Sequence, residues 1–423
     1  MYTTKRKLYP LYKRGSVDCV CLIFVLFYGV LGVSSSAWGK GDSKDILKKK
    51  IVTPSKVDIY FKPGKGLVVQ SKDGQNKIAT RLRAMLLTTV KNKAVGDDFD
   101  SSFQIRRARL AFSGNALGKQ NKYKVEFAFS SRDLGMKEGL LHRSPLLTWY
   151  LQFGLARDVN IRVGQYKIPY NRQRVISSGN LQFVDRSIAN GEFNLDRDTG
   201  LDIRSNDLFG LGKLHYAVGI YLRKGRDVSS SVDFQFMYLA RLEFLPFGKF
   251  KDYSSVDFAR YSSPRLSLGL AYAFIDDALK MQGNRGASPK DKGTSEIHNV
   301  VFDALFKFSG FSSMLEAFYR QGSRNPVEGV TDLDKPRNGF GFFVQAGYLF
   351  SGTTFEWAVR YGHVQPFDAA GSSLPEKYSL GTALSYYFVK HPLKLQMDYF
   401  RLWSGNGISE GINQFRLQLQ ASM

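Results

Sequence analysis

The 423-residue sequence has few of the residues from which metal, redox and nucleophilic sites are built. It contains two cysteines, both before residue 22, so the rest of the chain can form no disulfide and no thiol site. Its five histidines are scattered and show no metal-ligand spacing: His142, His215, His298, His363 and His391. It has neither a nucleophile elbow nor a phosphate-cradling loop. The sequence therefore predicts no enzyme, metal or cofactor, and leaves open only a site assembled from distant segments.

Acidic residues and long apolar runs are also scarce. There are 37 Asp and Glu against 60 Lys and Arg, which gives a formal net charge of +23. This charge suggests nucleic acid, a membrane surface or an anionic ligand as partner. Hydrophobic residues make up only 43%, too few for a helical membrane protein, whereas the 14% of aromatic residues is too many for a disordered basic chain.

The first 37 residues have the pattern of a secretory signal peptide. Five basic residues up to Arg14 precede the uncharged run Cys19–Val33, and the small residues Ser35-Ser36-Ala37 follow it. The alternative is a membrane anchor, but a run of about 15 residues is short of the ~20 that a spanning helix needs. We therefore expect an exported protein, which counts against nucleic acid as its partner. Residues 38–75 are predicted to form an exposed periplasmic arm with a short hairpin at Val57–Ser71, and residues 76–423 one further domain.

Alternating apolar and polar residues dominate this domain. In Arg106–Gly114, Ala108, Leu110 and Phe112 fall on one face of a strand, opposite Arg107 and Arg109. Similar segments of about ten residues recur to the end of the chain: Ile78–Val90, Arg106–Gly114, Tyr123–Phe129, Leu147–Phe153, Val159–Ile168, Gly200–Arg204, Leu214–Leu222, Phe236–Phe244, Leu266–Phe274, Val300–Phe308, Met314–Arg320, Phe340–Phe350, Phe355–Tyr361, Tyr378–Phe388, Leu393–Tyr399 and Phe415–Met423.

Such strands can build a soluble sandwich or a membrane barrel. The barrel is favoured because one face of the segments carries Arg, Lys, Gln, Glu, Ser and Gly, which suits a water-filled interior. Aromatic residues also gather at segment ends, as at Tyr348–Phe350 and Tyr386–Phe388, where interfacial girdles lie in such barrels. We therefore predict an all-β fold, a transmembrane antiparallel β-barrel of about 16 strands with an inward-folded loop.

Several motifs resemble those of a known family. They are Gly66–Gly74 running into Ile78–Arg83, Ile105–Gly114, Val163-Gly164-Gln165-Tyr166-Lys167-Ile168-Pro169-Tyr170, Phe183–Ser187 and Arg197–Asp202. In order and spacing they resemble the phosphate-selective porin O and P family of bacterial outer membranes, over about residues 60–205. The resemblance implies a sixteen-stranded barrel in outer-membrane lipid, usually a homotrimer, with a basic constriction that passes phosphate-like anions.

The candidate site residues are arginines in two groups. Arg81, Arg83, Arg107 and Arg109 are expected to line the lumen from early strands. Arg172, Arg174 and Arg186 belong to the long stretch Tyr170–Asp198, which we expect to fold inward as the constriction, the alternative being an external loop whose charges pair with one another. Arginine suits this role because its planar fork binds phosphate with two hydrogen bonds and stays charged.

The predicted function is that of an outer-membrane porin with an anion-preferring, water-filled channel for inorganic phosphate or other small anions. Two alternatives stay open: a general diffusion porin without phosphate preference, and a structural or adhesive barrel.

Overall fold

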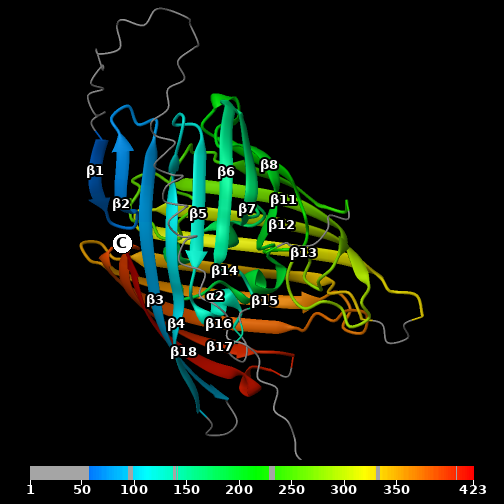
Figure 1. Cartoon of the computed structure of the whole chain (residues 1–423). Coiled ribbons are helices and arrows are strands. Elements are labelled where there is room, and N and C mark those ends of the chain that lie inside the picture. The colour runs from blue at the N-terminus through cyan, green and yellow to red at the C-terminus, as the bar shows by residue number, and fades with distance from the viewer. Residues whose placement is uncertain are drawn as a thin grey trace, which may run out of the picture. The chain divides into compact units, whose positions relative to one another are not determined.

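A computed structural model of the chain describes residues 57–93, 99–136, 140, 142–227, 234–329, 334–405 and 407–423. The predicted signal peptide and the first part of the predicted arm lie outside these ranges, and both stay predictions. Figure 1 shows the described residues as long strands that follow one another around a closed wall.

Sixteen strands form the barrel, as the alternating pattern predicts. They are β3 (Lys77–Lys93), β4 (Phe99–Asn115), β5 (Lys122–Ala128), β6 (Leu146–Ala156), β7 (Val159–Lys167), β8 (Arg197–Ser205), β9 (Leu214–Tyr221), β10 (Met237–Phe244), β11 (Arg265–Ala278), β12 (Thr294–Phe308), β13 (Phe311–Asn325), β14 (Gly339–Leu349), β15 (Phe355–Pro366), β16 (Lys377–Val389), β17 (Leu393–Trp403) and β18 (Ile412–Ser422). Each pairs antiparallel with the next, and β18 closes the barrel against β3. Every predicted segment overlaps one of these strands.

The predicted hairpin is also present, as β1 (Val57–Lys62) and β2 (Gly66–Ser71). β2 pairs with the first residues of β3. β18 pairs with the same edge of β3, from Arg83 to Lys93. Gly66 sits at this junction with a φ of +78°, and a Cβ there would lie 1.9 Å from the Thr80 carbonyl oxygen. Only glycine allows the backbones to approach this closely.

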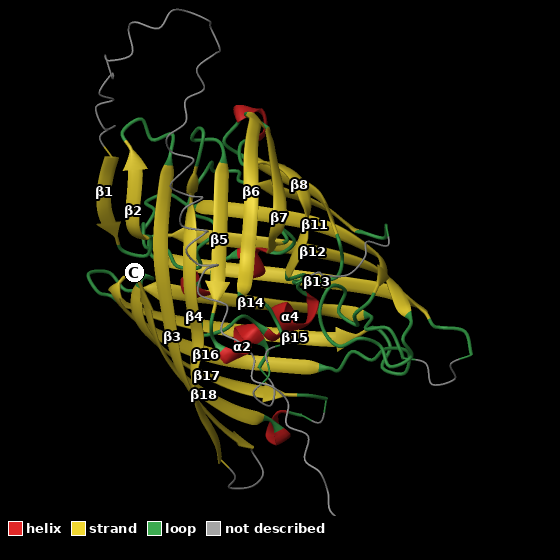
Figure 2. Cartoon of the chain, in the orientation of Figure 1, coloured by secondary structure: helices red, strands yellow, loops and turns green. Residues whose placement is uncertain are grey.

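Helices are short and lie in the connections between strands (Figure 2). They are α2 (Ser131–Leu134), α3 (Arg172–Val175), α4 (Ile188–Phe193) and the 3₁₀ turns η1 (Ser178–Asn180), η2 (Leu208–Gly210) and η3 (Ile408–Glu410). None of the helices in the described ranges has the length and apolar content that a membrane-spanning helix needs.

Side chains alternate between the outer and inner faces of the wall as predicted. On β9, Val218 and Ile220 are 52% and 46% exposed, whereas Ala217 and Tyr221 are buried toward the interior. Aromatic rings pack together at strand ends, as in the pair Tyr386–Phe388 with ring centroids 4.6 Å apart. The outer surface is therefore apolar with aromatic edges, as expected for a wall in contact with lipid.

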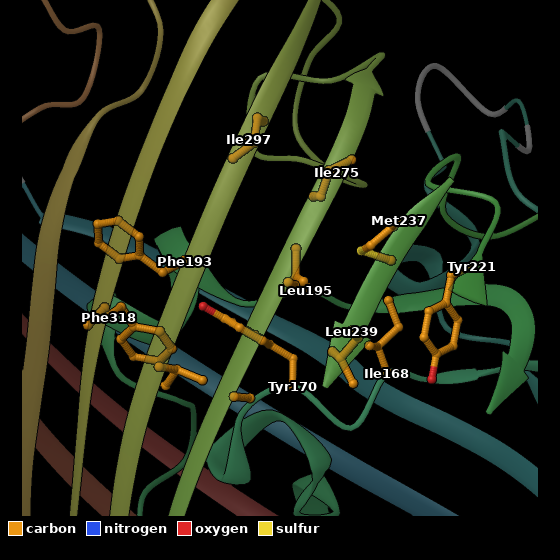
Figure 3. Packing of buried hydrophobic residues seen from close by; sticks show 14 of the residues in the cluster. Ile168, Tyr170, Phe193, Leu195, Tyr221, Met237, Leu239, Ile275, Ile297 and Phe318 are labelled. Atoms are coloured by element: carbon orange, nitrogen blue, oxygen red, sulfur yellow. The ribbon is translucent and has the colours of Figure 1, made fainter. Parts of the chain in front are cut away.

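The stretch between β7 and β8, residues 168–196, folds into the barrel. We call it the inner loop. Its Ile168, Tyr170 and Phe193 are fully buried against the inner faces of β9–β15, in the apolar cluster of Figure 3. The Phe193 ring stacks on Phe318 of β13 at 5.8 Å. The prediction of an inward-folded loop is confirmed, and this packing holds the loop against one side of the barrel.

A second connection also folds inward. Residues 245–264, which we call the inner turn, join β10 to β11 at the end of the barrel where most connections are short. Ser255 donates its backbone N–H to the Asn180 carbonyl of the inner loop at 3.1 Å. The two segments therefore meet inside the barrel and support each other.

Candidate functional site

The inner faces of β3 and β4 carry four of the predicted arginines. Arg81 and Arg83 lie on β3, and the register places Arg83 directly opposite Arg109 of β4 and Met85 opposite Arg107. Like charges opposite each other on a sheet repel. The arrangement therefore needs anions, which the protein or a solute can provide.

A β-bulge adds a further arginine to this wall. Met85 pairs with Arg107, but the next residue, Leu86, pairs with Ile105, so Arg106 is the extra residue. Arg106 is only 2% exposed and Arg107 7%, and both make ion pairs inside the barrel. A strict period of two would have placed Arg106 on the apolar outer face. The bulge is therefore the reason that two adjacent arginines share the lumen.

Asp185 at the tip of the inner loop is the meeting point of three arginines. Arg106 binds one of its carboxylate oxygens, Arg107 lies 3.7 Å from the other, and Arg416 of β18 approaches to 3.5 Å. Arg360 of β15 donates to the Asp185 carbonyl oxygen at 2.9 Å. Burial alone would raise the pKa of Asp185, but the three neighbouring guanidinium groups lower it. This guanidinium cage therefore favours the ionised form of Asp185.

A cavity of about 180 Å³ opens beside this carboxylate. The charged residues of its lining are Lys91, Asp100, Arg106, Arg132, Asp185 and Arg416. One water molecule occupies roughly 30 Å³ of liquid volume. The space thus suffices for a small oxyanion together with several waters, next to guanidinium groups that already bind a carboxylate.

The other β3 and β4 arginines differ in how strongly they are neutralised. Arg109 binds Asp133 of α2 through two hydrogen bonds of 2.9 Å, and Arg83 donates to the Ser177 hydroxyl at 3.0 Å. Arg81 makes no hydrogen bond or ion pair with another described residue. Arg81 and Arg83 therefore contribute charge without a carboxylate partner among the residues that the structure describes.

The three predicted arginines of the inner loop have three different environments. Arg172 is fully buried, and its guanidinium binds Asp303 at 2.6 Å and Asp252 at 3.1 Å. Arg174 is partly exposed and binds Asp196 of the same loop, with a hydrogen bond from Nε of 2.9 Å. Arg172 is positioned as an anchor for the loop, away from the cavity beside Asp185.

Arg186 binds backbone rather than carboxylates. It donates to the carbonyl oxygens of Gln173 at 2.8 Å and Ile176 at 2.7 Å, at the carboxyl end of α3, and Lys167 donates to the same segment. Burial, followed by the charges of Arg174 and Arg107, lowers the pKa of Arg186. A guanidinium nevertheless stays protonated at neutral pH, so Arg186 keeps an only partly compensated positive charge.

Several groups of this site lie outside the predicted set. They are Arg106, Lys124, Lys167, Arg197 and Arg416 among the cations, and Glu126, Asp133, Asp185 and Asp196 among the anions. The alternating pattern of β18 places Arg416 on the polar face of the strand, so its position in the lumen was predictable from the sequence. The partner of each arginine, in contrast, depends on how the inner loop folds.

A sequence profile of the phosphate-selective porin O and P family matches residues 88–244, from the end of β3 to the end of β10. This range contains β4 and the inner loop, and the matched family is the one that the motifs resemble. An uncharacterized protein of Aquifex aeolicus (strain VF5) is 25% identical over 325 residues, which cover 70% of this chain and 74% of that protein.

Two solved structures have similar folds. The anion-selective porin from Comamonas acidovorans has a TM-score of 0.55 at 11% identity, covering 82% of this chain and 99% of that one. A loop L8 deletion mutant of OmpT, an outer membrane protein of Vibrio cholerae, has a TM-score of 0.52 with the same identity and coverage. The family match and the fold together point to a porin channel rather than an enzyme, and to the bacterial outer membrane.

Proposed function

We propose that this porin is anion-preferring and passes inorganic phosphate and similar small oxyanions along the basic wall of β3, β4 and β18. The observation that carries the proposal is the cage around Asp185. Its carboxylate is an oxyanion held by Arg106, Arg107 and Arg416. Guanidinium groups that bind a planar carboxylate with charge-assisted hydrogen bonds also suit the oxygens of phosphate.

The spread of the arginines supports conduction rather than trapping. A channel needs sites that are favourable enough to enter and weak enough to leave. Arg81 and Arg83 on one side of Asp185, and the cavity with Arg106 and Arg132 on the other, offer a series of contacts. Asp133 and Asp185 moderate them, because each neutralises part of the positive charge. In this proposal the other predicted arginines raise the positive electrostatic potential of the lumen without binding the solute directly; they are Arg107, Arg109, Arg174 and Arg186.

Homotrimer assembly in outer-membrane lipid is part of the same proposal. The apolar outer faces of the strands, such as Val218 and Ile220 of β9, are exposed on the single chain and need lipid or a neighbouring subunit to cover them. The family resemblance favours three copies.

The test is reversal potential and current block in planar bilayers. In asymmetric chloride, we expect anion over cation selectivity, and added phosphate should reduce the chloride current. The block should weaken at 1 M salt, where the screening length is ~3 Å. The Arg107→Gln/Arg109→Gln variant keeps a polar lining but removes two charges, so its reversal potential should shift toward cations.

Each other outcome selects a different function. Cation preference in the parent, or an unshifted reversal potential in the double variant, would refute the basic-lumen mechanism. Anion preference without phosphate block would identify a general anion porin. A reconstituted trimer without measurable conductance would identify a structural barrel.

A further inference from the structure

Three potential metal-ligand side chains meet at the end of the barrel where the inner turn folds in, away from the Asp185 cage. His215 of β9 lies directly opposite Glu243 of β10 in the strand register, and Asp252 comes from the inner turn. One donor atom of each lies within 4.8 Å of the other two. His215 Nδ1 and Glu243 Oε2 are 3.1 Å apart, close to the separation of two ligands around one tetrahedral ion with bonds of ~2.0–2.1 Å.

Arginines bind one oxygen of each carboxylate, and the second oxygen of Glu243 faces His215. Glu243 Oε1 accepts from Arg241 Nε at 2.9 Å and lies 3.5 Å from Arg172, whereas its Oε2 faces the imidazole. Asp252 likewise uses Oδ2 for Arg172, at 3.1 Å. Supporting hydrogen bonds of this kind orient the ligands of metal sites.

Several buried charged groups meet at this point. Arg172 and Arg241 make ion pairs with the carboxylates of Glu243, Asp252 and Asp303, and Lys307 adds a further positive charge that acts on Asp252. The carboxylates are buried, with side chains at most 10% exposed, and an uncompensated buried charge is costly.

The donor set indicates the class of ion. One imidazole with two carboxylates suits Zn²⁺ and neighbouring divalent transition metals, while Mg²⁺ and Ca²⁺ prefer oxygen ligands alone. The buried Nε2 of His215 has no hydrogen-bond partner among the described residues. An ion on Nδ1 would replace the hydrogen bond from Nδ1 to Glu243, and the ring proton would then lie on Nε2. The ligands lie 28 and 9 residues apart in the chain, which no sequence spacing rule would detect.

We propose that His215, Glu243 and Asp252 bind one divalent transition-metal ion of the zinc class. Two of the ligands belong to the wall and the third to the inner turn. The ion therefore ties the inner turn to β9 and β10, beside the anchor Arg172 of the inner loop.

The test uses untagged full-length protein in detergent, stripped with a chelator and titrated with Zn²⁺ by calorimetry and with Co²⁺ by visible absorption. We expect one ion per chain, with the intense visible bands of a low-coordinate cobalt site, and no displacement by millimolar Mg²⁺. His215→Gln keeps a polar group opposite Glu243 but lacks the imidazole, and should weaken binding at least about 10-fold. The matched control is His363→Gln, whose histidine lies 3.9 Å from Glu376 at a distant strand; binding should stay unchanged.

Heat-modifiable migration in gel electrophoresis shows whether each variant is folded. If His215→Gln fails to fold, Asp252→Asn serves instead, because its amide oxygen can still accept from Arg172 while the negative charge is lost. Absence of saturable binding in the parent, or equal affinity in parent and folded variant, would show that His215 is simply the hydrogen-bond partner of Glu243 and would overturn the metal site.

Discussion

Replacing Asp185 with Asn should strengthen phosphate binding in the channel. The carboxylate competes with solutes for Arg106, Arg107 and Arg416, so its removal frees three guanidinium groups. For an anion about 6 Å from the carboxylate, the lost repulsion is about 0.7 kcal/mol in a water-like dielectric and about 2.8 kcal/mol at an effective dielectric constant of 20. This range corresponds to a roughly 3-fold to 100-fold tighter phosphate block of the chloride current.

The assay is the phosphate concentration that halves single-channel chloride current, measured in the parent and in Asp185→Asn. The loop should stay in place, because its backbone still binds Asp398 through Val184 and its Arg172 anchor is untouched. Asp207→Asn is the matched control, since Asp207 pairs with the exposed Lys249 outside the lumen. An unchanged or weaker block in Asp185→Asn would show that the cage is structural and that solutes pass elsewhere.

Three further predictions concern the wall and the inner loop. Val218→Arg should lower the free energy of unfolding by about 2–4 kcal/mol near the bilayer midplane, whereas Ala217→Ser on the inner face should cost less; equal effects in reversible unfolding would contradict the assignment of faces. Arg172→Met leaves buried carboxylates unpaired and should cost about 3–5 kcal/mol, unlike Arg174→Gln, whose pair is partly exposed. Burial would raise the pKa of Glu192, but its contacts with Arg337 and Arg320 hold it at about 2. The ion pair stabilises the loop fully at pH values above ~4.3, the pKa of Glu in the unfolded chain, and this stabilisation is lost as the pH falls toward 2. Conductance should therefore be constant from pH 7 to 4 and change at lower pH. Glu192→Gln should show at pH 7 the conductance that the parent shows in acid.

The number and order of the strands were predictable because each strand carries its own signal. One face meets lipid and the other water, so the side-chain period of two appears along the sequence in every segment. The ends of the strands were less predictable. β3 ends at Lys93 rather than at the predicted Val90, and β4 begins at Phe99 rather than at the predicted Arg106. The predicted segments were too short because these outer parts of the strands contain polar residues such as Asn92 and Ser102.

The pairing of charges was not predictable from the sequence. Arg172 and Arg186 belong to the same loop, yet Arg172 binds carboxylates 80 and 131 residues away and Arg186 binds backbone carbonyls nearby. The difference arises because Ile168, Tyr170 and Phe193 fix the loop on the apolar inner faces of β9–β15. Apolar residues on an inner face contradict the simple rule of a wet lumen, and they mark where a loop covers the wall.

The bulge at Arg106 leads to a last prediction. Removing Arg106 joins Ile105, which is 55% exposed on the outer face, directly to the inward Arg107, and so restores strict alternation without changing the pairs on either side. The deletion should therefore give a folded, heat-modifiable barrel with one lumen charge fewer and a smaller anion preference.

The matched control is deletion of Gln418 in β18, where no bulge can absorb the change. A one-residue shift there turns the following side chains to the opposite faces, so that Leu419 enters the lumen and Gln420 meets lipid. This variant should fail to form the heat-modifiable barrel. If both deletions assembled equally well, or if removal of Arg106 alone prevented assembly, the bulge would not be the device that places two adjacent arginines in the lumen.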